Sequence, residues 1–223
     1  MMSEKLLAKG LRNRQDAADY DRFSEAVLGP WDELFLDRCE ALRPVQTGTF
    51  VDVGAGTGVV LDRLSKRAAF AGWTMIGLEL FDDMVSAGNA RFAAQSVRAE
   101  MRQGDAQELP LADASVDMVV SRATIHHIPD KRTALKEMAR VLRPAGIGLI
   151  HDARRDMPKD LMDRFNAMRA EVGYLPTTLE EKLIPQEMET LLHEAGLASC
   201  STLAFGNDGL AALGFEVVIR AAS

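Results

Sequence analysis

Long apolar runs and grouped basic residues are both missing from this sequence. No stretch reaches the roughly 18 apolar residues that a membrane-spanning helix needs, so we expect no membrane segment. The formal net charge is −7, and Arg12, Arg14 and Arg22 are interspersed with aspartates. Because nucleic-acid binding depends on clustered Lys and Arg, we also expect no nucleic-acid partner.

Cysteine is scarce, with 2 residues in a chain of 223. Cys39 and Cys200 lie in no Cys-x-x-Cys or Cys/His pattern, so the sequence predicts no metal site. A single disulfide between them stays open. Lone cysteines are typical of a reducing compartment, and the first residues have no apolar segment with a small-residue cleavage site. We therefore expect a cytoplasmic protein.

Short β-rich runs alternate with helical segments along the middle of the chain. This pattern predicts parallel βαβ units, an α/β fold with helices on both faces of a sheet. Strands are expected at 49–56, 73–80, 97–105, 116–123, 145–153, 197–205 and 214–222, and helices at 59–69, 82–95, 131–144 and 185–195.

We expect one domain with four parts. Residues 1–46 form a helical N-terminal cap, which Gly29-Pro30 is expected to split into two helices. Residues 47–152 form the cofactor-binding core and 153–184 a helical insert that could act as a lid. Residues 185–223 form a closing helix and a strand hairpin.

A glycine-rich turn follows the first predicted strand. Gly54, Ala55, Gly56 and Gly58 have the spacing GxGxG, which differs from the GxGxxG of dinucleotide-binding proteins. Glycine lets a backbone turn tightly and approach a ligand closely. A nicotinamide dehydrogenase is therefore a weaker interpretation than another nucleotide-binding protein.

Acidic residues follow each of the first three strands. Asp52 could hold a cationic group, Glu79 could accept the hydroxyls of a ribose, and Asp105 could meet an adenine amino group. The carboxyl ends of parallel strands lie at one edge of a sheet, where ligands of such folds bind. Together with the glycine turn, these carboxylates predict a nucleotide cofactor.

The ordered motifs VDVGAGTG, GLEL, GDAQELPLADASVDMVVS, HHIPD and LRPAG resemble those of class I S-adenosylmethionine-dependent methyltransferases acting on small molecules. The resemblance implies a Rossmann-like seven-stranded sheet, mostly parallel, with an antiparallel C-terminal hairpin that dinucleotide folds lack. It also implies S-adenosylmethionine as the cofactor and S-adenosylhomocysteine as the product.

The resemblance also implies roles for individual residues. The glycines would flank the methionine part of the cofactor, Asp52 would contact its amino group, and Glu79 would bind the ribose. The remaining cofactor contacts that it implies are Leu80 packing on the adenine, Asp105 and Ala106 at the adenine edge, Ser121 and Arg122 at the sulfonium end, mainly through backbone, and Tyr20 covering the cofactor.

Three of the four histidines fall at strand ends and are candidates for a general base. Strand four ends at the transferred methyl in this family, and His126 and His127 follow it; His151 ends strand five. Histidine titrates near neutral pH, which suits a base for a protonated acceptor. Structural roles for all three stay open, as does a substrate-anion site at Arg154 and Arg155.

The predicted function is methyl transfer to an oxygen, nitrogen or carbon of a small-molecule acceptor. Two alternatives stay open: an S-adenosylmethionine-binding protein with non-methyl chemistry, and a non-catalytic regulator that binds this cofactor. A homodimer is common among such domains, and the sequence leaves the oligomeric state open.

Overall fold

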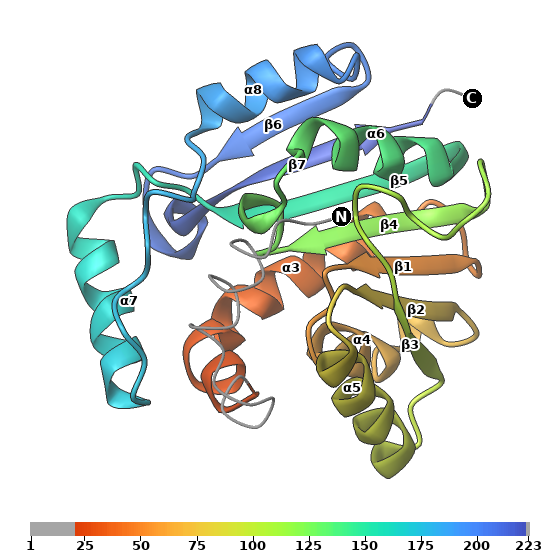
Figure 1. The fold of residues 1–223 in the computed structure, drawn as a ribbon, viewed down its shortest axis with the longest axis horizontal. Coiled ribbons are helices and arrows are strands. Elements are labelled where there is room, and N and C mark those ends of the chain that lie inside the picture. Colours follow the sequence, from red (N-terminus) through yellow and green to blue (C-terminus); the bar gives the residue numbers. More distant parts are fainter. Residues whose placement is uncertain (1–20, 222–223) are drawn as a thin grey trace.

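The computed structural model describes residues 21–221, which form a seven-stranded sheet flanked by helices (Figure 1). The strand order is β3-β2-β1-β4-β5-β7-β6. β7 pairs antiparallel with both β5 and β6, whereas β1 to β5 are parallel. The predicted Rossmann-like sheet is thus confirmed. The strands are β1 (Thr49–Val53), β2 (Thr74–Glu79), β3 (Ala99–Gln103), β4 (Val116–Arg122), β5 (Leu142–Ala153), β6 (Ser201–Phe205) and β7 (Gly214–Arg220).

Helices cover both faces of the sheet, as Figure 1 shows. One face packs against α3 (Gly29–Leu42), α4 (Val59–Ser65) and α5 (Asp82–Gln95). The other packs against α6 (Lys131–Val141) and α8 (Pro185–Glu194). Alternate residues of β4 serve the two faces, since Met118 and Val120 join the first core and Val119 the second. Every residue of β4 is buried, so this central strand is fixed from both sides.

The expected break at Gly29-Pro30 is wrong. Residues 21–42 form one continuous helical stretch, in which a π-helical segment, η1 (Ser24–Leu28), leads directly into α3. Pro30 therefore lies within this stretch, directly after the π-helical turns, where the regular α-helical hydrogen bonding is already interrupted. The wider π turns before it let the chain continue without a loop.

The insert after β5 lies at the margin of the fold (Figure 1). Its helix α7 (Lys159–Glu171) has no buried residue and contacts η1 and the 3₁₀ turn η4 (Gly209–Leu213). Two further 3₁₀ turns are η2 (Ala68–Phe70) and η3 (Ile125–His127). The division of the chain at residues 46, 152 and 184 stays a prediction.

Both cysteines are free, and Cys39 is buried in α3. The structure thus contains no bridge between Cys39 and Cys200. Within residues 21–221, no helix combines the length and apolar character that crossing a membrane requires.

Candidate cofactor and acceptor site

The glycine turn connects β1 to α4 in a conformation that suits glycine. Gly54, Gly56 and Gly58 all have positive φ, of 75°, 56° and 75°. A Cβ on Gly54 would overlap the side chain of Thr124, and one on Gly58 would lie 2.6 Å from the ring of Phe92. Two of the three glycines are therefore required by packing inside the protein as well as by the turn.

Glu79 ends β2 directly beside this turn. It is buried, and its Oε2 accepts a hydrogen bond of 3.0 Å from the amide of Gly56. Its Oε1 accepts from the amides of Leu80, at 2.9 Å, and Phe81, at 3.2 Å. The structure thereby brings the predicted ribose carboxylate and the glycine turn into direct contact. Leu80 is half-buried next to it.

A small cavity lies beside the same turn, between β1, β4 and α3. Its polar lining combines Ser24, Asp32, Asp52 and Arg122, and Gly54, Ala55 and two valines of α4 complete the wall. Asp52 and Arg122 are candidates from the sequence. Asp32 was not a candidate from the sequence. An aspartate next to Trp31, on the apolar side of a predicted helix, is unusual and could have indicated a buried functional carboxylate.

Burial shapes the electrostatics of this cavity. Burial raises the pKa of Asp52 to about 7, against the lowering effect of Arg122 and with a further rise from Glu79 and Asp32. Burial likewise raises the pKa of Asp32 to about 6, although Arg122 and Arg63 favour its charged form. The cavity therefore contains two carboxylates with raised pKa values and one guanidinium. Such a site can bind a zwitterion, a group that carries one positive and one negative charge.

The adenine-edge candidates lie beyond β3. Asp105 accepts hydrogen bonds from the backbone and side chain of Gln107, at 2.8 Å and 3.1 Å, so its carboxylate is held by a local turn. Ala106 is half-buried against the core.

Ser121, a candidate for the sulfonium end, is fully buried in β4, and its Oγ has no hydrogen-bond partner within residues 21–221. Tyr20 lies outside the described residues.

His126 belongs to a buried network with Asp152 and Lys182, of which the sequence did not indicate Lys182. Its Nδ1 is 2.6 Å from Oδ1 of Asp152, and its amide donates to Oδ2 of Asp152 at 2.9 Å. Its Nε2 is 3.1 Å from Nζ of Lys182, which comes from the insert and is itself buried. Burial lowers the pKa of Lys182. Both ring nitrogens of His126 therefore have partners, which favours a positioning role.

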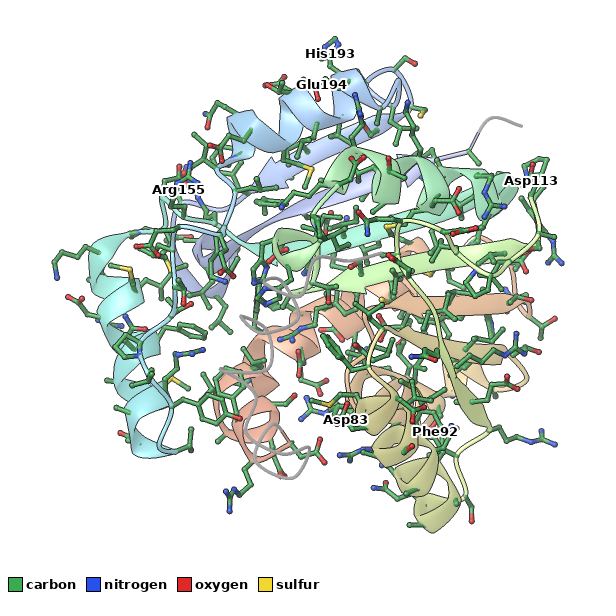
Figure 2. All side chains as sticks on the ribbon, in the orientation of Figure 1. Asp83, Phe92, Asp113, Arg155, His193 and Glu194 are labelled. Atoms are coloured by element: carbon green, nitrogen blue, oxygen red, sulfur yellow. The ribbon has the colours of Figure 1, made fainter. Side chains whose placement is uncertain are left out.

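The other histidines differ in exposure. His151 Nε2 lies 2.9 Å from Oε2 of Glu216, and its ring packs against Phe35 with centroids 5.0 Å apart. The side chain of His127 is 63% exposed, with Nδ1 3.4 Å from Glu181. His127 is thus the open one of the three candidates, and a role as base stays a prediction for each. Figure 2 shows His193 on the outer side of α8, away from the strand ends.

The two arginines after β5 are occupied by protein groups. Arg154 donates to both carboxylate oxygens of Asp156, each at 2.7 Å. Arg155, labelled in Figure 2 beside the start of α8, donates to Glu187 at 2.5 Å and to the carbonyl of Lys182 at 2.6 Å. These contacts favour a structural role, in which Arg155 ties the end of the insert to α8.

An apolar cluster lies between the N-terminal helix and the insert. Phe23 stacks on Tyr174 with ring centroids 4.5 Å apart, and Arg169 lies 4.9 Å over the ring of Phe23. Burial lowers the pKa of Arg169. The other members are Val27, Leu28, Trp31, Ala153, Met157 and Leu213, with Phe165, Met162 and Met168 partly buried against them. We call these residues the insert cluster.

Residues 51–150 match the family described as a methyltransferase domain. The strand order and the antiparallel β7 agree with this match, and the fold is that of the class I S-adenosylmethionine-dependent methyltransferases. S-adenosylmethionine is the cofactor of this class. The cavity combines groups that could hold its amino-acid end: the buried carboxylate of Asp52 and the buried guanidinium of Arg122, which is paired with Asp32.

Two curated relatives share the central part of the chain. A protein of Mycobacterium tuberculosis without an assigned function is 34% identical over 134 residues, covering 59% of this chain and 46% of the relative. A demethylmenaquinone methyltransferase of Lactobacillus johnsonii is 30% identical over 150 residues, covering 64% of this chain and 59% of the relative. The chain thus spans about half the length of these relatives.

Two solved structures share the fold over nearly the whole chain. A protein of Methanococcus maripaludis assigned to the S-adenosylmethionine-dependent methyltransferases has a TM-score of 0.73 at 22% identity, covering 100% of this chain and 98% of its own. A methyltransferase of Aquifex aeolicus has a TM-score of 0.66 at 20% identity, covering 93% and 99%. At these identities, the likeness concerns the fold.

Proposed function

We propose that this protein transfers the methyl group of S-adenosylmethionine to a small-molecule acceptor. The observation that carries the proposal is the contact between the glycine turn and the buried carboxylate of Glu79, inside the segment that matches the methyltransferase domain. A carboxylate held by backbone amides at the end of β2 is positioned to accept ribose hydroxyls. Glu79 would bind the ribose, and Asp52 the ammonium group.

The cofactor supplies an electrophilic methyl group on a sulfonium ion, which is already a good leaving group. The protein's task is therefore to bind, to align and to exclude water. The glycine turn and Glu79 fix the cofactor at the carboxyl ends of β1 and β2. The helical stretch 21–42 and the insert close the site from the other side.

The acceptor would bind next to the insert cluster. Aromatic and methionine side chains there favour an apolar or aromatic molecule, and the partly buried Arg169 could accompany a polar substituent. The name of the Lactobacillus johnsonii relative, a demethylmenaquinone methyltransferase, supports a small-molecule acceptor. Oxygen, nitrogen and carbon acceptors all fit this proposal. His127 is the candidate base for a protonated one.

Calorimetric titration with S-adenosylhomocysteine, with NAD as the comparison ligand, tests the cofactor assignment. We expect micromolar binding of S-adenosylhomocysteine only, and a loss of about 100-fold or more in Glu79→Ala, because several charge-assisted hydrogen bonds disappear. Asp117→Asn is the matched control. Its buried carboxylate lies at the start of β4, at the other end of the strand from the candidate site, and accepts a hydrogen bond of 2.8 Å from the amide of Thr49.

A turnover assay then separates an enzyme from a regulator. The protein is incubated with S-adenosylmethionine and a panel of phenols, amines and enolisable carbonyl compounds, and release of S-adenosylhomocysteine is measured. Turnover with one acceptor class, lost in Glu79→Ala, supports the proposal. Tight binding without turnover of any acceptor would favour the regulatory alternative. A folded protein that binds no S-adenosylhomocysteine would contradict both.

A further inference from the structure

The insert carries a guanidinium that no carboxylate of the described chain neutralises. Arg169 lies in the last turn of α7 and is half-buried. Its Nε donates to the carbonyl of Leu175 at 2.7 Å, and within residues 21–221 its side chain makes no ion pair and no further hydrogen bond. The two terminal nitrogens of this side chain therefore have no acceptor in the described part of the protein.

Three aromatic rings surround the guanidinium and fix its position. The carbon Cζ of Arg169 lies 4.9 Å from the ring centroid of Phe23 and 5.8 Å from those of Phe165 and Tyr174. The amide of Tyr174 donates to the carbonyl of Arg169 at 2.9 Å, so the loop after α7 folds back onto the helix. These contacts hold the side chain in place and leave its charge without a counter-charge.

A second arginine of the fold combines an aromatic contact with a carboxylate and serves for comparison. The carbon Cζ of Arg154 lies 4.5 Å from the ring centroid of Phe205, and its guanidinium donates to both carboxylate oxygens of Asp156. Arg169 has the aromatic contacts and lacks the carboxylate. The chain contains 33 Asp and Glu against 26 Lys and Arg, so a shortage of acidic residues does not explain the difference. A carboxylate from a ligand would complete the arrangement at Arg169.

The position of Arg169 connects it to the candidate site. Phe23, whose ring contacts Arg169, directly precedes Ser24, which lines the cofactor cavity. The insert cluster that contains Phe23 also packs against Ala123, the residue that follows β4. The guanidinium is thus one aromatic ring away from the segment that lines the cofactor cavity, beside the cluster where the acceptor would bind.

We propose that the acceptor is an aromatic carboxylate whose negative charge is bound by the two terminal nitrogens of Arg169. The inference rests on the proposed function and narrows its acceptor to one chemical class. A carboxylate is planar and matches the fork of a single guanidinium, whereas phosphate groups are typically recognised by several arginines together. The aromatic part would lie against Phe165 and Met168, whose side chains are half-buried beside the cluster.

The test uses pairs of ligands of nearly equal shape that differ in charge. Benzoate, salicylate, anthranilate and naphthoate are each compared with the corresponding amide by calorimetric titration into the complex of the protein with S-adenosylhomocysteine. The wild type should bind at least one acid about 10-fold or more tightly than its amide, the effect expected for hydrogen bonds to a charged group. Arg169→Met should bind the two alike, with the affinity for the amide unchanged.

Two further variants separate the guanidinium from its surroundings. Arg169→Lys keeps the charge and most of the stem, and it should keep only part of the preference, because it loses the planar fork. Arg164→Met is the matched control. Arg164 lies on the same helix, is exposed and makes no ion pair within residues 21–221, so this variant should keep the full preference.

The inference would be overturned by a wild type that binds every acid no better than its amide, with S-adenosylhomocysteine still bound normally. A preference that survives in Arg169→Met, or that is lost equally in Arg164→Met, would overturn it as well. Failure of S-adenosylhomocysteine itself to bind, before any acid is added, would instead contradict the proposed function. The two ideas therefore fail at different steps of the same experiment.

Discussion

Two clusters of buried charge lie at the carboxyl ends of the strands, and they differ in how far the protein satisfies them. Asp152 accepts hydrogen bonds from the ring and the amide of His126 and from the amide of Ala153. Arg122 and Asp32, in contrast, form one ion pair with each other, and Nε of Arg122 makes no hydrogen bond within residues 21–221. A complete network stabilises the fold, whereas an incomplete one has capacity left for a ligand.

The difference also appears in protonation. Burial disfavours the charge of Asp152, but His126, its hydrogen bonds and Lys182 outweigh this and lower the pKa. Burial dominates at Asp52 and raises the pKa to about 7. The completed cluster thus keeps its charge at neutral pH, while burial shifts Asp52 toward its protonated form.

The largest expected effect comes from breaking the complete cluster. Asp152→Ala leaves His126 buried without its acceptor and Lys182 buried without the nearby negative charge, and should lower the free energy of unfolding by about 3–5 kcal/mol. Denaturant unfolding at neutral pH measures this. The exposed Asp208→Ala is the control and should change it by less than about 0.5 kcal/mol. A loss of under about 1 kcal/mol in Asp152→Ala would show that the network does not stabilise the fold.

An intermediate effect is expected at Glu216, which joins His151 to Arg38. Burial opposes its ionisation, but hydrogen bonds from His151 and Arg38 together lower the pKa to about 2. Its contribution is therefore fully present above about pH 4.5 and is lost as the pH falls to about 2. Glu216→Gln should lower stability by about 2 kcal/mol at pH 7 and by much less at pH 2.

Denaturant unfolding of the wild type and Glu216→Gln between pH 2 and 7 tests this window. Asp117→Asn, also paired with an arginine, serves as the control for loss of a carboxylate elsewhere in the sheet. A difference between wild type and Glu216→Gln that is the same at pH 2 and pH 7 would contradict the assigned role of these hydrogen bonds.

The last effect concerns Asp52, which lines the cavity with Arg122 and Asp32, and has the opposite sign. The raised pKa of Asp52 means that the folded state binds more protons than the unfolded state between about pH 4 and 7, so stability falls as the pH rises through that range. Asp52→Asn removes this loss. Without ligand it should match the wild type near pH 4 and exceed it by a margin that grows to a few kcal/mol by pH 8 (about 1.4 kcal/mol per unit of raised pKa).

Thermal unfolding at several pH values, with and without S-adenosylhomocysteine, measures the Asp52 effect. With S-adenosylhomocysteine bound, the wild type should become more stable than Asp52→Asn, because Asn carries no negative charge to pair with the ammonium group. Asp32 is retained in both proteins, so its own raised pKa largely cancels. A stability difference that does not vary with pH would show that Asp52 is ionised in the unliganded protein.

Much of the fold followed from local patterns. Alternating β-rich and helical segments predicted the strands that became β1 to β7, and the helix expected at residues 185–195 became α8, with Gly196 at φ 77° just beyond its end. The break at Gly29-Pro30 was wrong, because π-helical turns directly before Pro30 interrupt the regular α-helical hydrogen bonding and let the helix continue through it. Local sequence alone did not reveal that adjustment.

The site divides in the same way. Glu79 lies beside the glycine turn as expected, because the carboxyl ends of adjacent parallel strands must meet at one edge. The histidines lie at strand ends, but two of the residues that meet their rings were not foreseen. Lys182 and Glu216 come from a loop and a strand far along the chain, and no local pattern indicates which imidazole nitrogen such residues will meet.

By itself, the sequence determined the strand and helix periodicity, the left-handed glycine turn and the order of acidic residues after the strands. These features depend on residues close together along the chain. The tertiary structure alone decided that Asp32 of α3 meets Arg122 of β4, and that the insert delivers Lys182 to His126. Burial and hydrogen-bond geometry between distant residues, and hence which charges are satisfied, arise only when helices and sheet pack together.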